Sequence, residues 1–153
     1  MSADTGILPD AAIYATWIHH HVPAAPRDIE GQCEYWAHYM AEVFPELSLC
    51  WGLVLRTDVP PYESVEDLSG HWWLMRSDGL LVDPTAHQFP WPVCYLVYDD
   101  TRGFFPLRHR ERASDEHGLV ASTTLWNGTP WTSVPPLTGH AERLAQQALR
   151  ELR

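Results

Sequence analysis

The sequence contains no lysine, and all ten of its basic residues are arginines. Twenty acidic residues therefore leave the chain with a formal net charge of −10. A protein this acidic repels phosphate backbones and anionic lipid surfaces, so we expect neither nucleic acid nor a membrane surface as a partner. The arginine-rich stretch at 108–112 is a local exception, and its pattern is typical of a solvated loop.

Long apolar runs are also absent, because no stretch approaches the roughly 18 residues of a membrane-spanning helix. The first ten residues hold no arginine and lead into no apolar segment, which predicts that there is no secretory signal. The cysteines, Cys33, Cys50 and Cys94, are odd in number and far apart, so we expect neither a disulfide framework nor a CxxC pair. These absences favour a reducing cytoplasm as the compartment.

The residues that are present fit one domain of 153 residues, with no repeat and no linker. Helical spacing predicts a helix at 10–21, capped by Asp10, and a second helix at 32–44. The tail at 139–153 is typical of an amphipathic helix. Apolar runs predict strands at 47–56, 71–77, 80–83, 92–100 and 118–126. Helices followed by strands in hairpin order predict an α+β domain with an antiparallel sheet.

Each of the two N-terminal helices carries large side chains at helical spacing. In the first helix these residues are Ile13, Trp17 and either His20 or His21. In the second they are Tyr35 or Trp36, Tyr39 or Met40, and Val43. Such spacing predicts one apolar side on each helix.

Cys33 stands directly after Gly31-Gln32, where the second helix is predicted to begin. A helix N-terminus lowers the pKa of a thiol through its dipole and its free N–H groups. A nucleophilic cysteine also needs a histidine to take its proton and a carboxylate to orient that histidine. His71 and Asp83, on the two arms of a predicted hairpin, supply both groups. The alternative is that Cys33 fills core space, that His71 is a strand-edge side chain and that Asp83 shapes a turn.

The hairpin register decides whether His71 and Asp83 can meet. A strict two-residue turn at Asp78-Gly79 pairs Leu74 with Asp83, and this pairing puts His71 and Asp83 on opposite faces of the sheet. A turn one residue longer, or a bulge, puts them on the same face. The triad hypothesis therefore predicts a register shift of one residue.

Three short motifs carry a family resemblance: "GQC" at 31–33, "HWW" at 71–73 and "LVDPT" at 81–85. Over residues 31–89 they resemble the transglutaminase-like core of the papain-like cysteine enzyme superfamily. The family order of cysteine, histidine and aspartate is kept, with spacings of 71 − 33 = 38 and 83 − 71 = 12. The resemblance implies a papain-like core in which N-terminal helices, with the nucleophile at a helix start, pack on an antiparallel sheet. Glu34 departs from the pattern, because the family often has an aromatic residue directly after the cysteine.

An oxyanion hole is expected beside the thiol, with the Cys33 backbone N–H as its first donor. Gln32, Trp17 and Trp72 are the candidates for the second donor. Further tryptophans, Trp73 and Trp91, are candidates with Trp72 for the walls of a substrate groove. Cys50 and Cys94 lie in apolar strands and are expected in the core. The histidine run at 19–21 has no partner at ligand spacing, so no metal and no cofactor are expected.

Together the motifs predict cysteine-dependent acyl transfer on an amide or a thioester. A transglutaminase, an amidase or deamidase and a peptidase all use this triad, and tailoring of a peptide or of a carrier-bound acyl group falls within the same range. The substrate is then a peptide, a protein or an acyl thioester, and nothing in the sequence indicates an oligomeric state. The alternative is a catalytically inactive transglutaminase-like binding module, which Glu34 beside the thiol supports.

Overall fold

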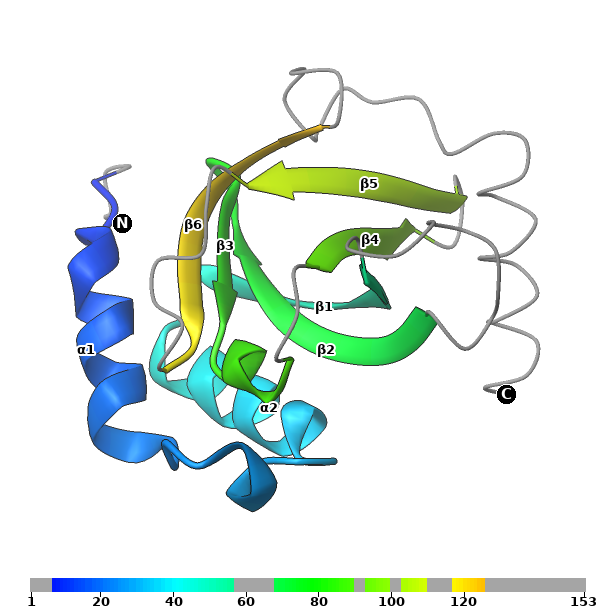
Figure 1. The fold of residues 1–153 in the computed structure, drawn as a ribbon. Helices are drawn as coiled ribbons and strands as arrows, with labels where there is room; N and C mark the ends of the chain where they lie inside the picture. Colours follow the sequence, from blue (N-terminus) through cyan, green and yellow to red (C-terminus); the bar gives the residue numbers. More distant parts are fainter. Residues whose placement is uncertain (1–6, 57–67, 90–92, 100–102, 110–116, 126–153) are drawn as a thin grey trace.

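The computed structural model describes residues 7–56, 68–89, 93–99, 103–109 and 117–125. Two α-helices and an antiparallel sheet make up these parts, in agreement with the predicted mixture of helix and sheet (Figure 1). The helix predicted at 139–153 lies outside the described residues. None of the described helices is both long and apolar enough to cross a membrane.

The helices begin and end close to the predicted positions. Helix α1 covers Ala11–His21, and the Asp10 side chain caps it by accepting a hydrogen bond of 2.8 Å from the Ala12 N–H. Helix α2 covers Cys33–Val43. Two short 3-10 helices, η1 (Pro26–Asp28) and η3 (Ala86–Gln88), follow α1 and β3 in the chain.

The buried sides of the helices agree with the predicted ones only in part, because Met40, one of the predicted alternatives, is fully buried and Trp17 and Trp36 pack against the core. In α1 the buried residues are Tyr14 and Ile18, and in α2 they are Ala37 and Met40. Much of the stripe that the spacing picks out is exposed instead, including Tyr35 and Tyr39. A period of 3.6 identifies a stripe but not the direction it faces, and small Ala37 permits the closer approach of α2 to the sheet.

Six strands form the sheet, and five of them were predicted. They are β1 (Leu47–Arg56), β2 (Leu68–Arg76), β3 (Leu80–Asp83), β4 (Val93–Asp99), β5 (Gly103–His109) and β6 (Leu119–Leu125). The unpredicted strand is β5, which contains Pro106, a residue that demotes a strand pattern. The predicted loop at 108–112 is therefore wrong at its first two residues, which end β5, and its other residues lie outside the described part.

The sheet closes into a barrel in the order β1-β2-β3-β6-β5-β4, with every pair antiparallel. Closure brings β1 against both β2 and β4, so that Gly52 pairs with His71 on one side and with Val97 on the other. Figure 1 shows the strands curving around a common interior, with α1 beside β6 and α2 beneath β2 and β3. The antiparallel sheet was predicted, but its closure was not.

Strand side chains alternate between two faces, and the barrel therefore has two cores. Its interior holds a cluster that includes Trp73, Met75, Leu81, Tyr95 and Leu107. The outer face packs on the helices through a second cluster, which includes Leu74, Leu80, Val82, Ile18 and Met40. Cys50 packs against the interior cluster, as predicted, whereas the Cys94 side chain is outside the described part. Trp73 is fully buried, so its predicted place in a groove wall is wrong, and Trp91 is not described.

Candidate active site

Cys33 is the first residue of α2, and its side chain is partly exposed. No side chain caps this end of the helix, because Gln32 at the cap position makes no capping hydrogen bond. Ala37 and Met40, four and seven residues further on, are fully buried against the barrel. Residues at this spacing share one face, so helix geometry directs the Cys33 side chain toward the barrel as well.

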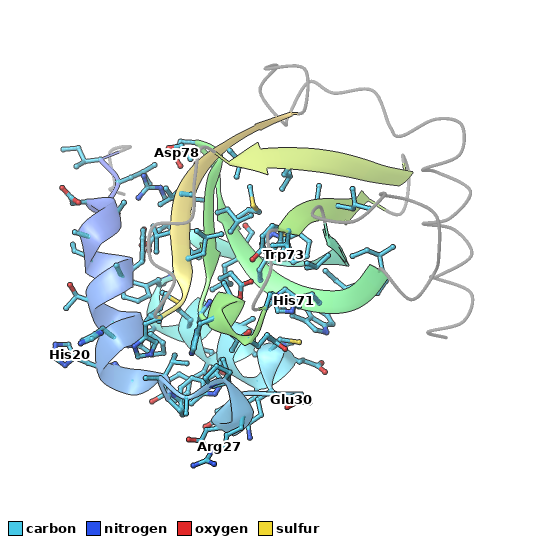
Figure 2. All side chains as sticks on the ribbon, viewed as in Figure 1. His20, Arg27, Glu30, His71, Trp73 and Asp78 are labelled. Atoms are coloured by element: carbon cyan, nitrogen blue, oxygen red, sulfur yellow. The ribbon has the colours of Figure 1, made fainter. Side chains whose placement is uncertain are left out.

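His71 belongs to β2, and its side chain points into the barrel with only 1% of its surface exposed. The imidazole stacks on Trp73 at 6.0 Å between ring centroids, and Phe89 meets it edge-on at 5.0 Å. Figure 2 shows His71 and Trp73 side by side within the ring of strands, while Asp78 marks the far end of the hairpin. Ring packing of this kind holds the imidazole in one orientation.

The hairpin joining β2 to β3 has the register that the triad hypothesis predicts. Leu74 pairs with Val82, one residue away from the pairing of a strict two-residue turn, which is wrong here. The physical reason is Gly79, whose φ is 91° and whose N–H donates to the Arg76 carbonyl at 2.9 Å. Residues 77–79 thus form a three-residue loop that ends in a left-handed glycine. His71 and Asp83 consequently face the same side, and His71 Nε2 lies 2.7 Å from Asp83 Oδ2.

Asp83 is fully buried and is surrounded by donors. His71 Nε2–H and the Tyr95 hydroxyl both donate to Oδ2, at 2.7 and 2.6 Å. The Thr85 N–H and hydroxyl donate to Oδ1, at 3.0 and 3.4 Å. Burial by itself raises the pKa of Asp83, but the His71 charge and these hydrogen bonds outweigh burial and hold the pKa below its ordinary value.

Cys33 completes the chain of contacts, because its thiol is hydrogen-bonded to His71. Asp83 occupies Nε2, which leaves Nδ1 to face the sulfur. Burial tends to raise the pKa of the Cys33 thiol, but the His71 hydrogen bond and charge bring it below the ordinary value. Burial also tends to lower the pKa of His71, yet the Asp83 charge and hydrogen bond raise it to about 9. Both shifts favour a thiolate next to an imidazolium.

Trp72 touches the same sulfur through its backbone. The Arg76 carbonyl faces β3, and backbone groups alternate along a strand, so the Trp72 N–H points to the β3 side as well. Strand β3 ends at Asp83, and the Trp72 N–H instead donates to Cys33, an interaction that lowers the pKa of the thiol.

The other predicted site residues, Gln32 and Trp17, make their contacts with aromatic side chains. Gln32 is exposed, and its Oε1 accepts a hydrogen bond from Trp36 Nε1 at 3.3 Å. Trp17 packs on Trp36, Tyr39 and Phe44, where α1 meets α2, and its role as an oxyanion donor stays a prediction. Its position is set by the contact between the helices, which the sequence does not show.

Glu34 is exposed, and it lies about 100° around the helix from Cys33. It lines a groove on the outer side of α2. Its side chain therefore leaves the helix in a different direction from that of Cys33, which weakens the main argument from sequence for an inactive module.

Sequence reasoning missed Tyr95 and Thr85 as partners of Asp83. Thr85 could have been found, because an aspartate two residues earlier commonly accepts a hydrogen bond from the backbone at this spacing. Tyr95 gave no such signal. It comes from β4, which is not a neighbour of β3, and its hydroxyl reaches Asp83 only across the interior of the closed barrel.

Replacing Tyr95 by phenylalanine should lower the free energy of unfolding by about 2 kcal/mol, because a hydrogen bond to a charged acceptor is lost. The Tyr95 hydroxyl lowers the pKa of Asp83, so without it the pKa rises and acid unfolding begins at higher pH. Urea denaturation between pH 3 and pH 7 measures both effects. Tyr35→Phe, at an exposed tyrosine, is the matched control, and equal behaviour of the two variants would contradict the role given to Tyr95.

Among the described residues, no group of three His, Cys, Asp or Glu side chains is arranged to hold a metal ion. Comparison of the chain with protein-family models, with curated proteins and with solved structures finds no match. The chemistry of the site therefore has to be argued from its own geometry. That geometry is a partly exposed thiol, a buried imidazole and a buried carboxylate in one hydrogen-bonded line.

Proposed function

We propose that the protein is a cysteine-dependent acyl-transfer enzyme of the transglutaminase-like, papain-like type, with Cys33, His71 and Asp83 as its triad. The observation that carries the proposal is the unbroken contact from the Cys33 thiol through His71 to the buried Asp83 carboxylate. A structural cysteine in a core needs no imidazole, and a structural histidine needs no carboxylate that is itself held by three further hydrogen bonds.

The reaction follows from the protonation states that the site favours. The Cys33 thiolate attacks the carbonyl carbon of an amide or a thioester, and its electron pair forms the new C–S bond. His71 gives its proton to the leaving amine or thiol, and the acyl group stays on Cys33 as a thioester. Water or an amine then attacks this thioester, His71 takes the proton of the attacking group, and Cys33 leaves as thiolate. Asp83 keeps the imidazole oriented and stabilises its positive charge throughout.

The negative oxygen of the tetrahedral intermediate needs donors close to the sulfur. The uncapped start of α2 offers the Cys33 N–H, and the dipole of the helix adds to its effect. The Trp72 N–H is the backbone donor that lowers the pKa of the Cys33 thiol, which makes Trp72 the second donor that we favour over Gln32.

The substrate is a peptide, a protein or an acyl thioester, and the acceptor is water or an amine, since one triad serves both. Hydrolysis would make the protein a peptidase, amidase or deamidase, and aminolysis would make it a transglutaminase or a tailoring enzyme. A free thiol of this reactivity requires a reducing compartment, so the proposal includes the cytoplasm.

Iodoacetamide at mildly acidic pH should alkylate Cys33 well before Cys50. The pKa of Cys33 lies below its ordinary value, whereas burial raises that of Cys50 to about 12. Because only the thiolate reacts, the alkylation rates of Cys33 and Cys50 in one molecule show how far each thiol is ionised in its own surroundings. Intact mass and peptide mapping over time give both rates, and His71→Ala should slow Cys33 several-fold.

The matched control is His20→Ala, which removes an exposed histidine from α1. It should leave the alkylation rate of Cys33 unchanged. If Cys33 reacts no faster than Cys50, or if both histidine variants behave alike, the thiol is not activated. The protein is then better described by the alternative, an inactive binding module.

A further inference from the structure

The outer side of the two helices carries aromatic rings that the barrel does not bury. Tyr35 is 58% exposed and Tyr39 is 40% exposed. Trp36 stacks on Tyr39 with 5.9 Å between the ring centroids, and Trp17 meets Tyr39 at 5.5 Å. We call Tyr35 and Tyr39, whose ring centroids lie 6.2 Å apart, the aromatic face, whereas Trp17 and Trp36 are partly buried and pack against the core between the helices and the barrel. Neighbouring large rings exposed in this way mark a contact surface more often than a solvated one.

A groove of about 690 Å³ runs along this face, a size suited to one or two side chains of a partner. Its described lining consists of Gly31, Glu34, Tyr35, His38, Tyr39 and Glu42. Helix α2 has two carboxylates in the groove and carries no arginine or lysine at all. Carboxylates beside the faces of tyrosine rings are the environment that a guanidinium or an ammonium group prefers.

The groove also adjoins the triad without containing the sulfur. Glu34 and Gly31 flank Cys33 in the chain, and the His38 ring lies 5.3 Å from the Trp72 ring. The Trp72 N–H in turn touches the Cys33 sulfur. Because Glu34, His38 and Glu42 follow one another at helical spacing on the outer face, a cation held there is a docking group and not the reacting group.

We propose that this groove docks an arginine or lysine side chain of a peptide or protein substrate and so presents a neighbouring acyl group to Cys33. The inference rests on the proposed function, since it names the kind of substrate that the triad acts on. A second copy of the chain is a poor occupant, because each copy carries a net charge of −10 and the face itself is acidic.

The test measures binding alone, in a Cys33→Ala background that cannot turn over a substrate. The probe is the peptide Gly-Arg-Gly-Arg-Gly-amide with fluorescein on its N-terminal amine, followed by fluorescence anisotropy at low salt. The comparison peptide carries citrulline in place of arginine, which keeps the shape and removes the charge. We expect the arginine peptide to bind about tenfold more tightly than the citrulline peptide. A lysine version should bind better than citrulline as well.

Two double variants remove the same charge at different places. Glu34→Gln with Glu42→Gln empties the groove of carboxylates and should weaken binding of the arginine peptide about fivefold or more. Asp28→Asn with Glu30→Gln removes two acidic groups that do not line the groove, and should change binding less than about twofold. Figure 2 places Glu30 beneath the barrel beside the start of α2, so this control tests the effect of nearby charge.

Two variants of Tyr39 test the ring. Tyr39→Phe should bind the arginine peptide like its parent, and Tyr39→Ala should bind it more weakly.

Equal binding of the arginine and citrulline peptides would overturn the proposal, and so would no binding of either. Equal weakening by both double variants would show general attraction to an acidic protein instead of a groove. If sedimentation shows that the protein is a dimer and that Tyr39→Ala is a monomer, the aromatic face is a contact between two copies of the chain. Alkylation of Cys33 in the wild type tests the triad separately, so failure of the groove and failure of the enzyme hypothesis are distinguishable.

Discussion

Asparagine in place of Asp83 is expected to lower the free energy of unfolding by about 3 kcal/mol or more and to slow alkylation of Cys33 strongly. Both carboxylate oxygens of Asp83 accept hydrogen bonds, Oδ2 from His71 and Tyr95 and Oδ1 from Thr85. An amide offers one acceptor oxygen and one NH₂ donor, so either orientation sets a donor against a buried donor. His71 also loses the charge that keeps it protonated, and Cys33 then loses its imidazolium partner.

Urea denaturation and timed alkylation at pH 6 measure the two effects of Asp83→Asn. The control is Asp78→Asn, which makes the same substitution in the same hairpin at an aspartate whose side chain is 46% exposed. Arg76 is buried and donates to both Asp78 oxygens, at 2.8 and 2.7 Å, but Asp78 itself meets solvent, so the expected loss is about 1 kcal/mol, well below that at Asp83. If the two substitutions cost the same, Asp83 is not the buried charged partner that the geometry indicates.

The pair of His71 and Asp83 also predicts the direction in which stability changes with pH. It is measured in Cys33→Ala, because an ionising thiol would otherwise oppose the His71 contribution. The pKa of His71 is raised from 6.5 to about 9 when Cys33 is present, and the Asp83 charge and hydrogen bond still raise it, by less, when Cys33 is replaced. Its stabilising contribution is therefore complete below pH 6.5 and is lost as the pH rises through the folded value. The pKa of Asp83 is lowered, so its contribution is present above pH 3.8 and is lost as the pH falls through the folded value. Stability should therefore fall from pH 6 to pH 9, and Asp83→Asn should abolish this fall.

The motifs around the triad could be predicted from the sequence because they are local. Helix spacing placed Cys33 at the start of α2, and the apolar runs placed His71 and Asp83 on two arms of a hairpin. Whether His71 and Asp83 are adjacent depends on a shift of one residue in the pairing of β2 with β3. The hydrophobic pattern does not determine this register, but the requirements of a catalytic triad do. A triad requires the two side chains on one face, and the three-residue loop provides this arrangement.

Closure of the barrel could not be predicted, and the missing parts of the site follow from it. Strand β5 was missed because Pro106 disrupts its pattern, and without β5 nothing links β4 to β6. The predicted sheet then gives no reason to place Tyr95 near Asp83, although the closed barrel brings the Tyr95 hydroxyl to 2.6 Å from Asp83 Oδ2. Which side of each helix faces the sheet could not be predicted for a similar reason. Periodicity groups Tyr35 and Tyr39 together, but only the packed sheet shows that Ala37 and Met40 face it.

The second large effect is expected at Gly52, which lies on β1 between His71 of β2 and Val97 of β4. A Cβ atom here would overlap the Leu96 carbonyl oxygen and would lie 2.7 Å from Cη2 of Trp73. The carbonyl belongs to a paired strand and cannot turn away, so relief requires separating β1 from β4. Because overpacking of a closed core costs roughly 1–3 kcal/mol and more where backbone is involved, Gly52→Ala should cost about 3 kcal/mol. Urea denaturation measures the cost.

Gly52→Ala should also slow alkylation of Cys33 in molecules that remain folded, because the displaced Trp73 ring stacks on His71. The control, Ser48→Ala, introduces the same side chain at an exposed position of the same strand and should change stability by less than about 0.5 kcal/mol. Adding Trp73→Phe to Gly52→Ala removes the clash with the indole but not the clash with the carbonyl, so stability should return only in part. Full stability of Gly52→Ala would mean that β1 and β4 are not as close as the barrel requires. The path from Tyr95 across the interior to Asp83 would then lose its structural basis.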